Sequence, residues 1–168
     1  MIISLIYLII SFILDNLMSN IFTSYLTNIN YFTTIYIIIA FVIIYPYFNN
    51  KNKYYLLISI FGILFDILYT STFIFNLILF LVLGIIIKIF NEIFPTNVFT
   101  INIISLSIII IYHTLSFVIL SLVSDVSYNF ILLINIILHS IIMTIIYTSI
   151  SYYVMKYIYS KLNIKQIK

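Results

Sequence analysis

Apolar residues along this chain come in long runs that short polar breaks separate. Six runs reach the length of about 17–25 residues that a helix needs to cross a bilayer. They cover residues 2–21, 29–48, 54–70, 73–90, 98–123 and 130–158. The pattern predicts an all-α polytopic membrane bundle with six transmembrane helices, in one integral membrane domain that covers residues 1–168.

The polar breaks differ in strength. The segments NNKNK (49–53), NEIFPTN (91–97) and SDVSYN (124–129) are strong breaks, and TSYLTN (23–28) is a moderate one. Only TST (70–72) separates the third run from the fourth. Two interpretations stay open there: a very tight turn between two spans, or a kink in one long helix, which would leave five spans.

Composition agrees with a membrane location. Hydrophobic residues make up 65% of the chain and charged residues only 7%, which is too little charge to cover the surface of a soluble domain. The chain has no cysteine, which excludes disulfides and thiolate metal sites. The first apolar run lacks a basic start and a small-residue cleavage site, so we expect a retained transmembrane helix and not a cleaved signal peptide.

The placement of the positive charges predicts the orientation. All seven basic residues are lysines. Lys51 and Lys53 follow the second run, Lys88 lies at the end of the fourth, and Lys156, Lys161, Lys165 and Lys168 lie at or after the end of the sixth. With six spans they share one side of the membrane, which the positive-inside rule makes cytoplasmic, with both termini. Five spans would divide them between the two sides, which favours six. The lysines are too dispersed for a nucleic-acid surface, and we expect the tail to contact anionic membrane lipid.

Asp66 interrupts the third apolar run, in the stretch GILFDILYTS. A charged Asp at the centre of a membrane helix costs about 2.5–3.5 kcal/mol, so such a residue normally faces other helices or a wet cavity. Steps of three and four place Tyr55, Ser59, Gly62, Asp66 and Tyr69 on one stripe. Gly62 lets a neighbouring helix approach closely. Asp66 is then either a structural carboxylate, protonated or hydrogen-bonded to Asn or Ser, or a residue that binds a partner or ligand.

Other runs carry similar polar stripes, which predict hydrogen bonds between helices. The stripes are Ser4, Ser11 and Asp15 in the first run, Asn76, Phe80 and Gly84 in the fourth, Asn102, Ser105, Tyr112 and Ser116 in the fifth, and Asn135, His139, Ser149 and Tyr153 in the sixth. We expect Asp15 and Asp125 to be interfacial and solvated. Lys88 and Glu92, four positions apart, are expected to form a surface pair.

The sequence contains few side chains in patterns typical of catalytic or metal sites. The chain has no G-x-S-x-G and no P-loop motif, and its polar residues form no recognisable catalytic set. His113 and His139 lack the spacing of a metal site, so we expect them to be hydrogen-bonded packing residues. The sequence predicts no enzyme, no cofactor and no metal.

The run GILFDILYTSTFIFNLILFLVLGIIIKIF, about a sixth of the chain, resembles the central region of the MreD family of rod shape-determining membrane proteins. That family has a Gly-x-x-x-Asp helix, a tight turn, and a helix with an early Asn and a later Gly near a basic end. The matching residues are Gly62, Asp66, Asn76, Gly84 and Lys88. The family often has a glycine just before the polar residue of the second helix, where this chain has Ile74 or Phe75. It also often has a proline near the start of the second span, where this chain has only Pro46, at the end of that span.

The resemblance implies a non-enzymatic scaffold subunit of the cell-elongation machinery in the bacterial cytoplasmic membrane. Its partners would be MreC and, less directly, RodA, a class B penicillin-binding protein and the MreB filament. It also implies partner-binding or structural roles for Gly62, Asp66, Asn76 and Gly84. The family is similar in fold to the substrate-binding subunits of energy-coupling-factor vitamin transporters.

That similarity supplies the alternative, a substrate-binding subunit of such a transporter. Asp66, Asp125, Tyr128 and Asn129 could contribute to a vitamin site near the outer face. Such a subunit would also need faces of small residues on its first spans to dock the coupling subunit. This chain has only two glycines and one alanine, Ala40, so that docking face is weakly represented. A third class, a small intramembrane enzyme, is supported only by Asp66 and the two histidines.

Overall fold

The computed structural model describes residues 2–23, 34–48, 50–70, 74–123 and 130–164, without the side chains of residues 19–23, 123 and 132. This part contains six α-helices and no strand, so the predicted all-α class is confirmed. The helices are α1 (Ile2–Thr23), α2 (Tyr36–Ile44), α3 (Lys51–Phe65), α4 (Phe75–Ile93), α5 (Val98–Val123) and α6 (Phe130–Lys161). A 3₁₀ turn, η1 (Tyr45–Tyr47), extends α2, and a π-helical turn, η2 (Asp66–Thr70), extends α3.

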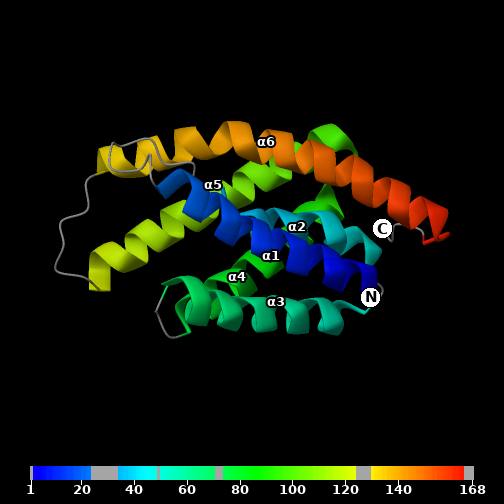
Figure 1. Cartoon of the computed structure of the whole chain (residues 1–168), viewed down its shortest axis with the longest axis horizontal. Coiled ribbons are helices and arrows are strands. Elements are labelled where there is room, and N and C mark those ends of the chain that lie inside the picture. Colours follow the sequence, from blue (N-terminus) through cyan, green and yellow to red (C-terminus); the bar gives the residue numbers. More distant parts are fainter. Residues whose placement is uncertain (1, 24–33, 49, 71–73, 124–129, 165–168) are drawn as a thin grey trace.

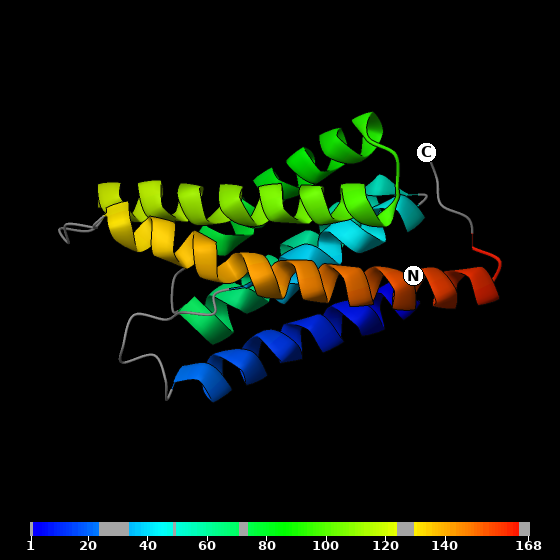
Figure 2. The ribbon, with the colours of Figure 1, turned by 90° about the horizontal axis from the view of Figure 1, so that it is seen from above.

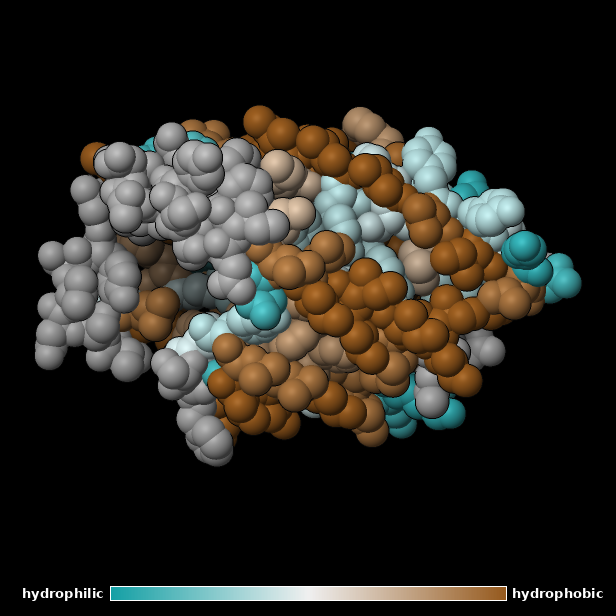
Figure 3. Space-filling model, in the orientation of Figure 1, coloured by the Kyte–Doolittle hydropathy of each residue, from teal (hydrophilic) through white to brown (hydrophobic). Residues whose placement is uncertain are grey.

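Four segments are long and apolar enough to cross a membrane: Lys51–Thr70, Phe75–Ile93, Val98–Leu122 and Leu133–Lys161. The other two helices contribute the shorter apolar stretches Ile2–Met18 and Tyr36–Tyr47. Isoleucine, leucine and phenylalanine side chains cover much of the outer surface in Figure 3. These features fit a multi-pass membrane protein, and a crossing by the first two helices stays a prediction.

The helices alternate in direction along the bundle (Figures 1 and 2). One end therefore gathers the starts of α1, α3 and α5 and the ends of α2, α4 and α6. These segments carry the described lysines, Lys51, Lys53, Lys88, Lys156 and Lys161, so we name this the lysine end. These five lysines lie at one end of the bundle, as a common membrane side requires, while Lys165 and Lys168 lie outside the described residues.

Helix α2 forms the centre of the bundle. All nine of its residues are buried, and it packs against α1, α4, α5 and α6. Its sequence, YIIIAFVII, has no polar face, and a helix that is apolar all round is stable only when other elements surround it.

Helices α3 and α4 form a tight hairpin and pack along each other (Figure 1). The single long helix that the weak break at 70–72 allowed is therefore wrong. Ile74, which precedes α4, has a φ of 68°, in the left-handed region that β-branched residues rarely adopt. This strained residue lies at the start of the helix that receives Asp66.

Candidate functional site

The carboxylate of Asp66 caps the first turn of α4. Its Oδ1 atom accepts hydrogen bonds from the backbone N–H and the Nδ2 of Asn76, both at 2.9 Å. Its Oδ2 atom accepts from the backbone N–H of Leu77 at 3.1 Å, and the Thr70 hydroxyl lies 3.3 Å from Oδ1. The Asp66 side chain is buried. The predicted bond from this carboxylate to an asparagine is therefore present.

The local sequence explains why α4 needs a cap from another element. The residue at the N-cap position is Ile74, whose side chain cannot accept a hydrogen bond, so the N–H groups of the first turn have no local partner. Asp66 supplies the missing acceptors from η2. Its negative charge also lies at the positive end of the α4 dipole, where an anion is stabilised.

Gly62 sets the distance between the two helices. A Cβ at this position would lie 2.8 Å from the Cα of Leu77 and 3.3 Å from the carbonyl oxygen of Asn76, which are both backbone atoms. The close approach predicted for Gly62 is confirmed, and the neighbour is the first turn of α4. The second glycine, Gly84, faces the same seam, where its Cβ would meet the side chains of Ile58 and Tyr55. Both glycines of the chain thus lie between α3 and α4.

Asn76 carries the network on to α5. Its Oδ1 accepts a 2.8 Å hydrogen bond from the Tyr112 hydroxyl, and its Nδ2 also lies 3.2 Å from the Thr70 hydroxyl. The Tyr112 ring contacts Phe80 of α4, with ring centroids 6.2 Å apart. The spacing of polar residues puts Tyr112 on the polar stripe of α5 but does not specify its partner on α4.

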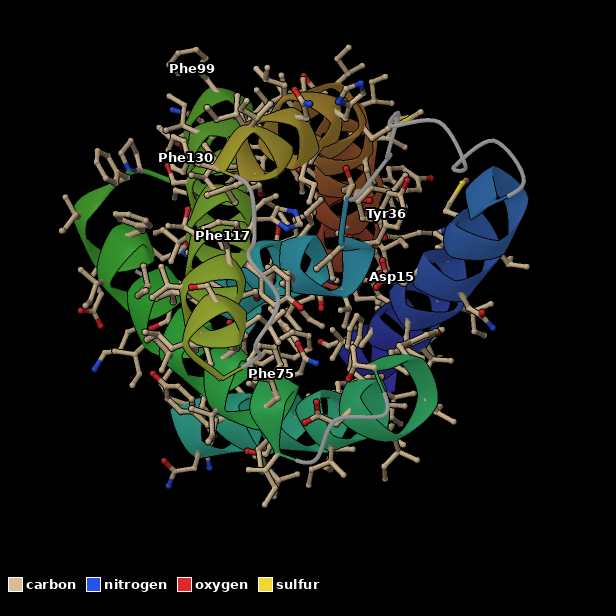
Figure 4. The ribbon with its side chains drawn as sticks, turned by 90° about the vertical axis from the view of Figure 1, so that its left-hand side faces the viewer. Asp15, Tyr36, Phe75, Phe99, Phe117 and Phe130 are labelled. Carbon is tan, nitrogen blue, oxygen red and sulfur yellow. The ribbon has the colours of Figure 1, made fainter. Side chains whose placement is uncertain are left out.

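Asp15 makes the same kind of cap on α2. Its two carboxylate oxygens accept from the backbone N–H groups of Tyr36 at 2.6 Å and Ile37 at 3.0 Å. The N-cap residue of α2 is Ile35, which again has no side-chain acceptor. Figure 4 shows Asp15 directed at the start of α2, beside Tyr36. The expectation of a solvated Asp15 was wrong, because backbone donors take up both oxygens.

An aromatic contact joins η2 to α1 at the end opposite the lysines. The Tyr69 hydroxyl donates to the Phe12 carbonyl at 2.8 Å, and the two rings are 4.9 Å apart. Phe12 also packs against Phe61 of α3 at 5.7 Å. The turn that carries Asp66 is therefore held against α1, the helix that carries Asp15.

Several predicted bonds between helices are confirmed. Ser4 bonds to the Tyr159 hydroxyl at 2.7 Å, Ser11 to the Tyr147 hydroxyl at 2.8 Å, and the Asn102 amide donates to Ser149 at 3.0 Å. Asn76, Phe80 and Gly84 are all buried on one face of α4. Tyr153 does not fit its predicted stripe, because 61% of its surface is exposed.

The remaining predictions have mixed outcomes. His139 is bonded within its own helix, to the Asn135 carbonyl at 2.7 Å. Lys88 and Glu92 form the expected exposed pair, with 4.0 Å between Nζ and Oε1. Asp125, Tyr128 and Asn129 lie outside the described residues, so three of the four side chains proposed for a vitamin site are not placed.

Asp15 and Asp66 both use their carboxylate oxygens to hold the start of another helix. Across the described residues, no three His, Asp or Glu side chains gather as a metal site would require. No family model, curated protein or solved structure matches the chain. The function therefore has to be inferred from the capped hairpin and from the residues that compose it.

Proposed function

We propose that this chain is a non-enzymatic membrane scaffold subunit of the bacterial cell-elongation complex, and that its α3–α4 hairpin helps to form the surface that MreC binds. The observation that carries the proposal is the Asp66 cap. Both oxygens of this carboxylate hold α4 against α3, so the acid organises a rigid hairpin and is not presented to a substrate. A scaffold needs such a preorganised surface, since ordering a surface on binding costs affinity.

The residues of the MreD resemblance support this proposal by their place in the fold. Gly62, Asp66, Asn76 and Gly84 all lie on the seam between α3 and α4. The family often has a glycine just before the polar residue of the second helix, and in this region Ile74 has a left-handed φ of 68°. Glycine adopts that conformation most readily, so the backbone at Ile74 has the angle that a glycine in this region would favour.

The membrane topology in this proposal has six spans, with the lysine end in the cytoplasm. Helix α1 has 22 residues. At 1.5 Å per residue it is about 33 Å long, close to the thickness of the hydrocarbon core. Cytoplasmic lysines would face anionic lipid and the MreB filament, while RodA and the penicillin-binding protein would associate alongside MreC.

The alternative, a substrate-binding subunit of a vitamin transporter, has less support. A vitamin site near the outer face would draw on Asp66, but this carboxylate already accepts bonds from Asn76 and Leu77. Releasing it would leave buried backbone donors unpaired, at a cost of about 1–3 kcal/mol each.

Affinity purification separates the two functions. The tagged full-length chain is solubilised in mild detergent from its native membranes, and mass spectrometry identifies the proteins that co-purify. Recovery of MreC with wall-synthesis enzymes would support the scaffold function. Recovery of a coupling subunit with paired ATPases would overturn it in favour of the transporter.

Two variants connect the result to the hairpin. Asp66→Leu removes the cap and is expected to reduce the MreC recovered per molecule of bait. Ile67→Leu changes the adjacent, exposed residue and should leave recovery unchanged. If Asp66→Leu elutes as a monodisperse protein in gel filtration and still recovers MreC normally, the capped hairpin is not what MreC recognises.

A further inference from the structure

An apolar groove runs between α1 and α6. Its volume is about 410 Å³, and its walls come from both helices: Ile3, Ile6 and Ile10 of α1, and Ile150, Val154 and Ile158 of α6. Figure 3 shows the two helices as brown bands with a paler strip between them. Tyr7, Tyr147 and Ser151 also line this groove. About half of the Ile6 surface is exposed, so the groove opens to the lipid side of the bundle.

A pocket of about 320 Å³ lies at the lysine end. Four polar residues line it, Ser4, Asn50, Lys53 and Tyr159, together with Tyr47, Phe48 and Ile164. On α1, Ser4 directly follows the groove residue Ile3, and on α6, Tyr159 directly follows Ile158. The bond between the Ser4 and Tyr159 hydroxyls, at 2.7 Å, marks the junction. The groove and the pocket are thus lined by consecutive residues on both helices, and Lys53 brings one positive charge to the pocket.

We propose that the groove and the pocket together bind one anionic phospholipid from the leaflet at the lysine end. An acyl chain would lie along the groove, and the phosphate would meet Lys53 in the pocket. Charge complementarity selects this occupant, because the Lys53 side chain is exposed and has no acidic partner among the described residues. The Ser4 and Tyr159 hydroxyls bond to each other, so the pair keeps one O–H donor, and the Asn50 amide nitrogen adds a donor that suits phosphate oxygens.

The size of the preference follows from membrane electrostatics. One lysine near an anionic membrane surface contributes about 1 kcal/mol, or about a fivefold preference for an anionic over a zwitterionic headgroup. This inference does not depend on the scaffold function, since it requires only that the bundle lies in a bilayer.

The chain contains no tryptophan, so one introduced tryptophan reports on one place. Ile6→Trp puts the probe in the groove, and Ile85→Trp puts it on an exposed position of α4 away from the groove. Each full-length variant is reconstituted into phosphatidylcholine vesicles with a small fraction of acyl-brominated phosphatidylglycerol or phosphatidylcholine. The ratio of quenching by the two brominated lipids cancels the depth of the probe. We expect about a fivefold preference for phosphatidylglycerol at position 6 and none at position 85.

Charge variants in the Ile6→Trp background test the headgroup site. Lys53→Gln should abolish the preference, and Lys156→Gln, on α6 but outside the groove and the pocket, should preserve it. Equal quenching by both lipids at position 6 would mean general boundary lipid and would overturn the proposal. Absence of quenching by either lipid would mean that protein covers the groove, and would overturn it too. A preference that survives Lys53→Gln would overturn the placement of the phosphate.

Discussion

The Oδ1 atom of Asp66 lies 2.9 Å from both the backbone nitrogen and the Nδ2 atom of Asn76. One carboxylate oxygen therefore caps α4 and also orients the Asn76 side chain, from which the hydrogen bonds to α5 begin. With its Nδ2 directed at Asp66, Asn76 presents its Oδ1 to the Tyr112 hydroxyl of α5. Three helices thus depend on a single acid, and the following predictions test how much each part contributes.

Replacement of Asp66 should separate charge from hydrogen bonding. Asp66→Asn retains one acceptor oxygen and a good capping residue, so we expect a loss of about 1 kcal/mol in the free energy of unfolding. Asp66→Leu leaves the N–H groups of Asn76 and Leu77 unpaired and should cost about 3 kcal/mol. Unfolding in mixed detergent micelles, followed by circular dichroism, measures both. Equal losses for the two variants would contradict the capping role.

The two glycines provide a matched pair. Gly62→Ala brings a methyl group to 2.8 Å from the Leu77 backbone, so the helices must separate, and overpacking of this kind costs about 1–3 kcal/mol. Gly84→Ala meets the flexible end of Ile58, which can rotate away. We therefore expect Gly62→Ala to lower the thermal midpoint clearly more than Gly84→Ala, as measured by gel filtration after heating. The reverse order would contradict the close contact at the Asp66 end.

Ile74 offers a stabilising substitution. Its φ of 68° costs a side-chain-bearing residue about 1–2 kcal/mol, and glycine avoids that cost. Ile74→Gly is expected to raise the free energy of unfolding by about 1 kcal/mol after its own loss of chain entropy. Ile74→Val keeps the β-branched side chain and serves as the control, with no gain expected. A gain from valine and none from glycine would show that the side chain, not the backbone angle, matters.

Removal of the Tyr112 hydroxyl tests the connection to α5. Tyr112→Phe leaves the Asn76 Oδ1 without this donor, and a bond between membrane helices contributes about 0.6 kcal/mol on average. A loss of about 0.5–1 kcal/mol is expected, measured by the same micelle unfolding. Tyr157→Phe, at a position that is 67% exposed on α6, is the control and should change nothing. In the background of Asp66→Leu the Tyr112→Phe effect should shrink, since the two residues share Asn76 and effects within one network are not additive.

The periodicity of the chain was enough to find Gly62 and Asp66 on one inward face, because their spacing of four positions fixes a common side of any helix. It was not enough for Asp15, which also interrupts an apolar run. Its role depends on the first turn of α2, more than 20 positions later, where Ile35 supplies no cap. The sequence did contain one signal for this role: α2 begins without a polar N-cap residue, and Asp15 is an acid in the preceding apolar run.

By itself, the sequence determined that this protein is helical, that several of its helices are long and apolar enough to cross a bilayer, and that its five described lysines share one end. These properties follow from the length of the apolar runs, the low charge and the position of the breaks. Each of these features can be read from a short segment of sequence without knowing which segments meet in space. Only the tertiary structure decided which donor each buried polar group meets. The pairing of Asp66 with Asn76, and of Asn76 with Tyr112, depends on how helices are arranged around α2, which is apolar on every side and specifies no neighbour of its own.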